Sequence, residues 1–294
     1  MASTGAITAN LYKRSDPVEI GGFEWIADGY EVERAWQLEC KPKDNVRTSL
    51  WSCLFVADFC HYSADGRKEA VYLVEDGFLQ QNYAYTIILW NSSTFHKACD
   101  IVERDPCEFF PTRINIKIVE SFIVDLSDPR NSLIEDRADS VKVKVEGELL
   151  YLSKKVLSFQ SKFFNRLFSQ DSNEKTEDAY ELPDVDLDEF LNFLSIVHCL
   201  RISINICNVE DLLKLGELYQ SKIVMDRCEE FLLGIPDLEQ LTLIEQFRLA
   251  NKFKLNQLLM KIVQEVTTED LKSFPKSELS EFAIEMVLLK CTQH

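Results

Sequence analysis

Apolar and polar residues alternate along the first half of Asp139–Leu152, so every second side chain there can face a core. Three valines at alternate positions in the first half predict a strand with one buried face. Glu146-Gly147 predicts a tight turn, after which Leu149–Leu152 predicts the returning strand. In Val156–Phe168 the apolar residues change to helical spacing, with Ser161 as a capping residue. This stretch therefore predicts a β-hairpin followed by helices rich in phenylalanine.

The segments that follow also carry strand and helix signals. Tyr180–Leu182 predicts a short third strand, and Asp186 with Glu189 three residues later predicts a capped helix start. Asn208–Leu233 predicts two helices that meet near Gln220-Ser221. Apolar residues at helical spacing then continue through much of the remaining chain. The second half of the chain is thus expected to be mixed α/β and then helical.

The first part of the chain has a different pattern, made of short runs rich in aromatic and β-branched residues. These runs are Phe23–Ile26, Trp36–Cys40, Leu50–Phe59, Tyr83–Trp90 and Ile114–Val119. Short alternating runs separated by turn residues predict an antiparallel β-sandwich. All four tryptophans precede residue 91, whereas twenty-seven of the thirty-six leucines follow residue 139. This shift predicts an all-β domain followed by a mostly helical one.

The seam between the two patterns is the polar, proline-containing stretch Ser127–Ser132, which is followed by charged residues. We therefore predict a β-domain at residues 1–127 and a linker at residues 128–138. A mixed α/β domain is expected at residues 139–234, followed by a helical extension at residues 235–294.

Charge and composition narrow the class of partner. The formal net charge of −17 argues against nucleic acid and against anionic membrane, because both require a basic face. No apolar run is long enough to span a membrane, and the N-terminal residues lack the apolar stretch of a signal peptide. The nine cysteines are odd in number and follow no CxxC spacing, which indicates free thiols. We expect a cytoplasmic or nuclear protein whose partners are other proteins.

Candidate catalytic and metal-binding groups are few. Cys53, Cys60 and His61 lack a fourth ligand at zinc-site spacing, so buried strand cysteines are the better interpretation. His198-Cys199 with Cys207 has the residue types of a Cys–His nucleophile, but adjacent helical residues point about 100° apart and no third group orients them. No phosphate-binding loop or hydrolase motif occurs. We expect no enzyme, no cofactor and no metal, since an enzyme would need a site that the sequence does not display.

The ordered signals of residues 139–233 resemble a BTB (POZ) domain. The N-terminal runs GGFEW, LEC and LWSC, with the late alternating strand, resemble a MATH domain, which is a TRAF-like sandwich. A MATH sandwich before a BTB domain is the arrangement of BATH proteins, which are abundant in nematodes. The resemblance implies an α+β multidomain chain, in which an antiparallel MATH-like β-sandwich precedes an α/β BTB domain with a C-terminal helical extension.

The resemblance implies an adaptor that recruits target proteins to a cullin-3 ubiquitin ligase. In BTB adaptors a hydrophobic–x–Glu motif, in the loop after the Phe-rich helix, docks on cullin-3. Ser172 and Glu174 occupy the two ends of that motif here, so the glutamate is present and the hydrophobic residue is not. The surrounding acidic stretch, Asp171–Glu189, also fits a solvated loop with helix caps. The alternative function is a dimeric BTB scaffold that does not engage a cullin.

The resemblance also implies two binding surfaces. The homodimer interface is expected on the hairpin and first helices, where Asp139 lies near the interface or else faces water at a strand end. Its candidate residues are Asp139, Val156, Leu157, Phe159, Phe163 and Phe164. A groove for a target peptide is expected near Tyr83, Tyr85 and Trp90, with packing in a core as the alternative.

Overall fold

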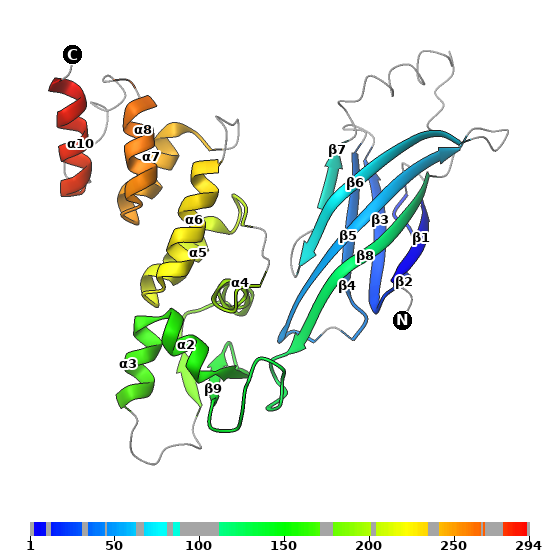
Figure 1. Cartoon of the computed structure of the whole chain (residues 1–294), viewed down its shortest axis with the longest axis horizontal. Helices are drawn as coiled ribbons and strands as arrows, with labels where there is room; N and C mark the ends of the chain where they lie inside the picture. The colour runs from blue at the N-terminus through cyan, green and yellow to red at the C-terminus, as the bar shows by residue number, and fades with distance from the viewer. Residues whose placement is uncertain are drawn as a thin grey trace. The chain divides into compact units, whose positions relative to one another are not determined.

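The chain folds into two compact units, Met1–Ser132 and Leu133–His294, in a computed structural model (Figure 1). The described residues are 3–9, 13–30, 35–44, 46–62, 68–80, 85–88, 112–170, 179–200, 204–234, 241–265, 267 and 279–292. The division between the units falls inside the segment predicted as a linker, and each unit packs a hydrophobic core of its own.

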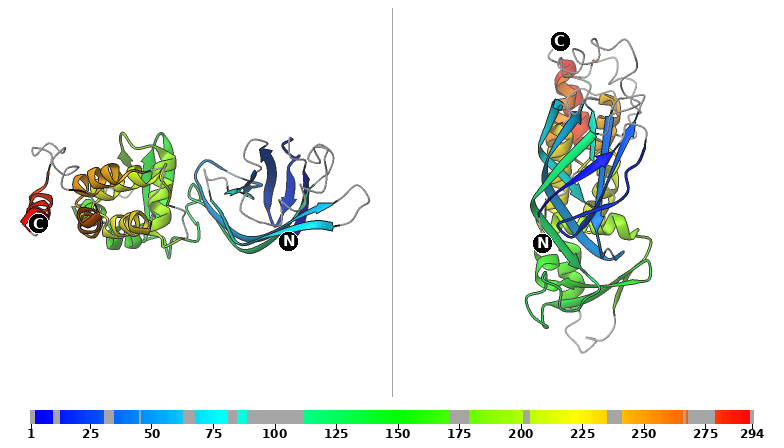
Figure 2. Two further views of the ribbon diagram at one scale, coloured as in Figure 1. Left: turned by 90° about the horizontal axis from the view of Figure 1, so that it is seen from above. Right: turned by 90° about the vertical axis from the view of Figure 1, so that its right-hand side faces the viewer.

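The first unit is a sandwich of two four-stranded antiparallel sheets. One sheet consists, in spatial order, of β1 (Thr4–Ala9), β8 (Thr112–Asp125), β5 (Ser49–Tyr62) and β6 (Lys68–Gln80). The other consists of β2 (Val18–Ile20), β3 (Phe23–Tyr30), β4 (Ala35–Pro42) and β7 (Tyr85–Ile88). The long strands of the first sheet curve beneath the second (Figure 2). The predicted β-sandwich is confirmed, and β1, β2 and β6 are strands that the pattern did not single out.

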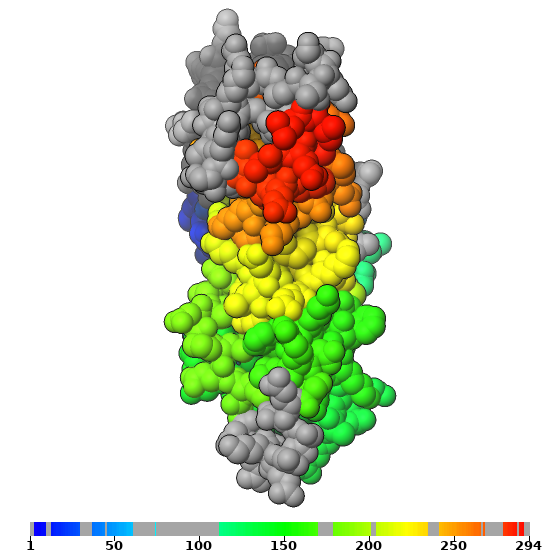
Figure 3. All heavy atoms as spheres, turned by 90° about the vertical axis from the view of Figure 1, so that its left-hand side faces the viewer, coloured from blue at the N-terminus to red at the C-terminus, as the bar shows by residue number. Residues whose placement is uncertain are grey.

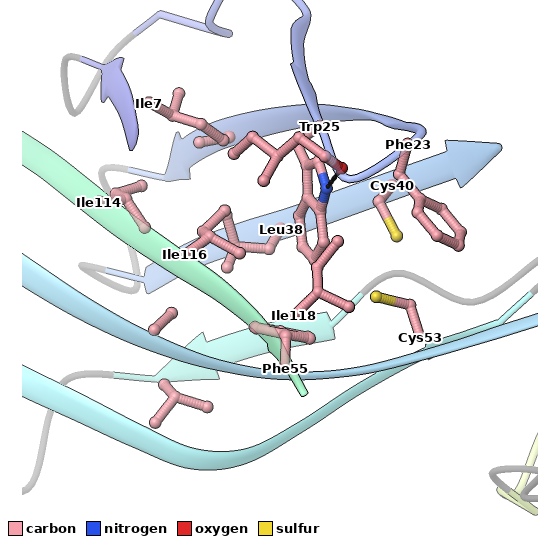
Figure 4. Packing of buried hydrophobic residues seen from close by; sticks show 14 of the residues in the cluster. Ile7, Phe23, Trp25, Leu38, Cys40, Cys53, Phe55, Ile114, Ile116 and Ile118 are labelled. Carbon is pink, nitrogen blue, oxygen red and sulfur yellow. Dashed lines mark hydrogen bonds between the residues drawn. The ribbon is translucent and has the colours of Figure 1, made fainter. Parts of the chain in front are cut away.

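Alternate residues of the facing strands fill the space between the two sheets. Trp25 of β3 is fully buried, and its indole Nε1 donates a hydrogen bond of 3.3 Å to the Ile20 carbonyl (Figure 4). Its ring packs edge-on against Phe55 of β5, with centroids 5.0 Å apart. Such aromatic pairs stabilise a core by about 0.5–1.5 kcal/mol beyond the area that they bury. The sandwich is therefore held by cross-sheet contacts between residues far apart in sequence.

Two cysteines meet inside this core. Cys40 of β4 and Cys53 of β5 come from opposite sheets, and their sulfur atoms point toward one another (Figure 4). Burial, reinforced by the hydrogen bond and charge of Cys53, raises the pKa of the Cys40 thiol well above its ordinary value. Cys60 is buried as well, so the interpretation of the strand cysteines as buried free thiols is confirmed for Cys53 and Cys60.

The second unit begins with a three-stranded sheet. Its spatial order is β10 (Glu148–Ser153), β9 (Ser140–Val145) and β11 (Tyr180–Leu182), with β11 parallel to β9. The hairpin turn lies at Glu146 and Gly147, whose φ angles of 47° and 86° suit a two-residue turn of the kind that right-twisted strands prefer. The predicted hairpin and third strand are both confirmed.

Helices make up the rest of this unit and follow one another along it (Figure 3). They are α2 (Lys154–Gln160), α3 (Lys162–Gln170), α4 (Leu187–Val197), α5 (Val209–Leu218), α6 (Lys222–Gly234), α7 (Leu243–Lys252), α8 (Asn256–Glu265) and α10 (Glu281–Thr292). Asp186 caps α4 as predicted, because its Oδ1 accepts hydrogen bonds from the N–H groups of Asp188 and Glu189. Thr242 and Glu245 form a reciprocal capping box at α7. The sequence analysis did not predict this cap, although the T-x-x-E spacing is a known signal for it.

Candidate interaction face

The junction between the hairpin and α2 is organised by one buried carboxylate. Asp139 lies just before β9, and its Oδ2 accepts hydrogen bonds from the Ser153 hydroxyl at 2.8 Å and the Glu135 N–H at 3.2 Å. Its Oδ1 accepts from the Lys155 N–H at 2.8 Å. Ser153 in turn caps α2 by accepting from the Val156 N–H. Asp139 thus fixes where the sheet ends and the helix begins, and the alternative that it faces water at a strand end is wrong.

Hydrogen bonding decides the charge state of Asp139. Burial by itself raises the pKa of this carboxyl group, but the hydrogen bonds from the Lys155 N–H, the Ser153 hydroxyl and the Glu135 N–H outweigh burial. With the added charge of Lys155, they hold the pKa of Asp139 below its usual value of 3.8. The carboxylate therefore stabilises the fold at neutral pH.

Replacing Asp139 with asparagine is expected to lower the free energy of unfolding by about 1–3 kcal/mol at pH 7, because one amide N–H₂ then faces an N–H or O–H donor. The pKa of Asp139 is lower in the folded state than in the unfolded state. The stability that the carboxylate contributes is therefore fully present at a pH above the unfolded-state pKa, and it is lost as the pH falls through the folded-state pKa. The gap between wild type and variant should shrink below about pH 4. Urea unfolding followed by circular dichroism at 222 nm measures it.

The exposed Asp226, which pairs with Lys222 one helical turn away, provides the control. Asp226→Asn should change the unfolding free energy by less than about 0.5 kcal/mol. Equal losses for Asp139→Asn and Asp226→Asn would contradict the role given to Asp139.

The candidate interface residues on α2 and α3 divide by exposure. Phe159 projects from α2 with 87% of its surface exposed. Val156 and Phe163 are half-buried. Leu157 and Phe164 are fully buried in the core of their own unit. Leu157 and Phe164 therefore cannot form surface contacts as expected, because both already pack inside one chain, and the exposed face of α2 centres on Phe159.

Tyr219, just after α5, is the centre of an aromatic cluster beneath this face. Phe163 and Phe164 of α3 lie 5.3 and 4.9 Å from it between ring centroids, and Phe193 of α4 lies 5.2 Å away. The Ser161 hydroxyl donates to the Tyr219 carbonyl at 2.5 Å and accepts from the Phe164 N–H, which confirms Ser161 as a cap. Burial raises the pKa of Tyr219, which keeps the phenol neutral. The sequence analysis missed Tyr219, since its partners lie up to 58 residues away.

The histidine and cysteines of the Cys–His pair weighed in the sequence lie in different environments. His198 is largely buried at the end of α4, and burial lowers its pKa to about 4, so the imidazole is neutral. The Cys199 and Cys207 side chains are exposed. Across the described ranges, no group of three or more His, Cys, Asp and Glu side chains is placed to hold a metal ion. Among the helices the structure describes, none is long and apolar enough to span a bilayer.

Several predicted site residues fall outside the described part of the chain. Ser172 and Glu174, the candidate cullin-docking residues, belong to this group, as do Tyr83 and Trp90 of the expected target groove. Tyr85 begins β7 and pairs with Leu38 of β4, at the edge of its sheet in the described strand order.

Comparison with known proteins locates a BTB domain in the second unit and finds relatives that match most of the chain. A family model described as "BTB/POZ domain" matches residues 135–235. The chain is 25% identical to BTB and MATH domain-containing protein 36 of Caenorhabditis elegans, over 89% of this chain and 84% of that protein. It is also 25% identical to BTB and MATH domain-containing protein 38 of C. elegans, over 82% of this chain and 61% of that protein. Kelch-like protein 24a of Danio rerio is 26% identical over 52% of this chain and 26% of its own length.

The resemblance drawn from the sequence is thereby confirmed. The BTB match begins at the Asp139 junction and ends after α6, and the matches to BTB and MATH domain-containing proteins extend across most of the chain. A two-sheet sandwich followed by the hairpin and helices agrees with that order of domains. Over most of its length the chain is therefore similar to BTB and MATH domain-containing proteins, which agrees with the BATH resemblance drawn from its sequence.

Proposed function

We propose that this chain is a dimeric adaptor that recruits target proteins to a cullin-3 ubiquitin ligase. The observation that carries the proposal is the pairing of a BTB domain at residues 135–235 with a separately packed β-sandwich on one chain. One unit can then bind the ligase while the other binds the target. The chain contributes binding surfaces, and the ligase contributes the chemistry.

Self-association would use the exposed face of α2. Phe159 is a large apolar side chain almost fully in water, and contiguous exposed apolar surface of this kind can mark a protein–protein contact. Half-buried Val156 and Phe163 supply further apolar surface on α2 and α3. A two-fold interface uses the same patch on both copies, so one exposed anchor is present twice in the dimer.

Target binding would use the edge of the second sheet. Among the described strands, β7 ends the order β2-β3-β4-β7, so an extended peptide could add beside it and form main-chain hydrogen bonds. Tyr85 lies on this strand, and Tyr83 and Trp90 flank it in sequence. Aromatic side chains at these positions would anchor the side chains of the target.

Cullin docking is expected to be present but weak, because Ser172 stands where the docking motif has an apolar residue. Burying a large apolar side chain contributes about 1.5–3 kcal/mol, so serine should cost about one to two decades in affinity. Ser172→Phe is therefore expected to bind more tightly than wild type. Calorimetric titration of the cullin-3 amino-terminal region into the full chain measures both affinities.

Ser169→Phe provides a matched control, because Ser169 is an exposed position on α3 outside the motif. It should leave the affinity within about twofold of wild type, as expected for a surface residue away from the contact. Binding by neither wild type nor Ser172→Phe would favour the alternative function, a BTB scaffold that dimerises without a cullin. Ser172 itself is the observation that favours this alternative.

A further inference from the structure

A hollow of about 490 Å³ opens on the outer face of the first sandwich sheet, at its β1 side. This face of the sheet is turned toward the viewer in Figure 1. The strand register places Ala6 of β1, Asn115 of β8 and Asp58 of β5 in one row across the hollow. The side chain of Ala6 is small, so it projects little from the sheet at the β1 end of the row. The volume lies within the range of about 300–1,000 Å³ typical of ligand sites.

Two cationic side chains stand on either side of this row. Alternation along β8 buries Ile114, Ile116 and Ile118 in the core and leaves Arg113 and Lys117 exposed on the outer face. They are four residues apart on one strand, which corresponds to about 13 Å along it. Asn115 lies midway between them, so the hollow has a cation at each end and an amide in the middle.

These cations have few partners of their own. Within the described ranges, the Lys117 side chain has no hydrogen bond or ion pair, and the Arg113 side chain uses only its Nε, which donates to Asn115 Oδ1 at 3.0 Å. The chain as a whole carries 49 acidic and 32 basic residues, so acidic partners are abundant elsewhere. Other surface lysines of the sandwich form ion pairs with acidic residues: Lys43 pairs with Glu19, and Lys41 pairs with Glu24. The hollow is therefore a local positive site on an acidic protein.

The carboxylate of Asp58 also lines the hollow, and it already accepts hydrogen bonds within the protein. Asp58 Oδ2 accepts hydrogen bonds from Asn115 Nδ2 at 2.7 Å and from the Cys60 thiol at 3.0 Å. Asn115 also accepts from the Nε of Arg113. The row is thus polar at its centre and is flanked by a positive charge at each end.

We infer that this hollow docks an extended acidic segment of a partner protein, with carboxylates about four residues apart on Lys117 and Arg113. A nucleic acid fits poorly, because two cations cannot offset the repulsion from a chain of net charge −17. The site lies on the sheet opposite to β7, which carries Tyr85 of the expected target groove. It would give the sandwich a second, charge-selective contact with its target.

The test uses the full chain and a fluorescein-labelled heptapeptide, Ser-Glu-Ser-Gly-Ser-Glu-Ser, with a Gln-for-Glu peptide beside it. Fluorescence anisotropy should show saturable binding of the Glu peptide that weakens as salt is raised. Lys117→Glu should weaken it about five- to tenfold, because the variant replaces an attraction with a repulsion. The Gln peptide should bind at least fivefold more weakly than the Glu peptide.

Lys41→Glu, on β4 of the other sheet, is the matched control, since it makes the same change in net charge at an exposed lysine. It should leave the affinity within twofold, and tryptophan fluorescence checks that both variants keep the folded sandwich. If the conservative Lys117→Gln has no effect, or if Lys41→Glu weakens binding as much as Lys117→Glu, the hollow is not the site. Absence of saturable binding at 1 mM peptide would overturn the inference, whatever the outcome of cullin docking.

Discussion

Phe164→Ala is expected to lower the free energy of unfolding of the BTB unit by about 3–5 kcal/mol, the usual cost of removing a buried phenylalanine from a core. Phe164 is fully buried, and its ring contacts Phe163, Phe168 and Tyr219 at centroid distances of 5.2, 5.7 and 4.9 Å. These rings join α3 to the end of α5, so alanine would leave a cavity between two helices that the rest of the unit cannot easily close.

The chain offers two spectroscopic signals that separate its units. All four tryptophans belong to the sequence of the first unit, residues 1–132, whereas every helix of the described ranges lies in the second unit. In urea, the Phe164→Ala transition followed by circular dichroism at 222 nm should move to lower denaturant, and the tryptophan fluorescence transition should stay in place. Leu218→Ala, at an exposed leucine on α5, should move neither signal by more than about 0.5 kcal/mol. A fluorescence transition that shifts with Phe164→Ala would show that the units do not unfold separately.

Phe159→Glu is expected to weaken self-association by two to four decades. Burying a phenylalanine contributes about 1.5–3 kcal/mol, and two-fold symmetry counts it twice in each dimer. A glutamate pair in the same place adds the cost of desolvating two like charges. Because Phe159 is 87% exposed, the variant should fold as well as wild type. Sedimentation velocity over a dilution series measures the dissociation constant.

Leu288→Glu serves as the control for Phe159→Glu. Leu288 is another exposed apolar residue, on α10 at the far end of the same unit in sequence. If the interface is on α2, Leu288→Glu should leave the dissociation constant within about twofold. Loss of self-association only in Leu288→Glu would move the interface to the helical extension.

The features of this fold that depend on neighbouring residues could be predicted from the sequence. The alternation in β9, the Glu146-Gly147 turn and the Asp186 cap all depend on residues within a few positions of one another, so they could be predicted. The shift from aromatic runs to leucine-rich spacing likewise located two units. Local rules are sufficient here because each of these features is stabilised by its own neighbours.

The division of α2 and α3 into buried and exposed residues could not be predicted in the same way. α2 ends at Gln160 and α3 begins at Lys162, and the break at Ser161 shifts the helical phase between Phe159 and Phe164. Which phenylalanine is buried then depends on Tyr219, which approaches from α5. The partners of Asp139 and the row across β1, β8 and β5 also join distant segments. Such sites become visible only when the strands and helices are assembled.

The central claim, that the chain acts as a dimeric adaptor, is tested most directly by its mass in solution. Multi-angle light scattering of the full chain, eluted at tens of micromolar, should give twice the 34.0 kDa chain mass. The same measurement on Phe159→Glu should give 34.0 kDa. A wild-type chain that elutes as a clean monomer at that concentration would contradict the account.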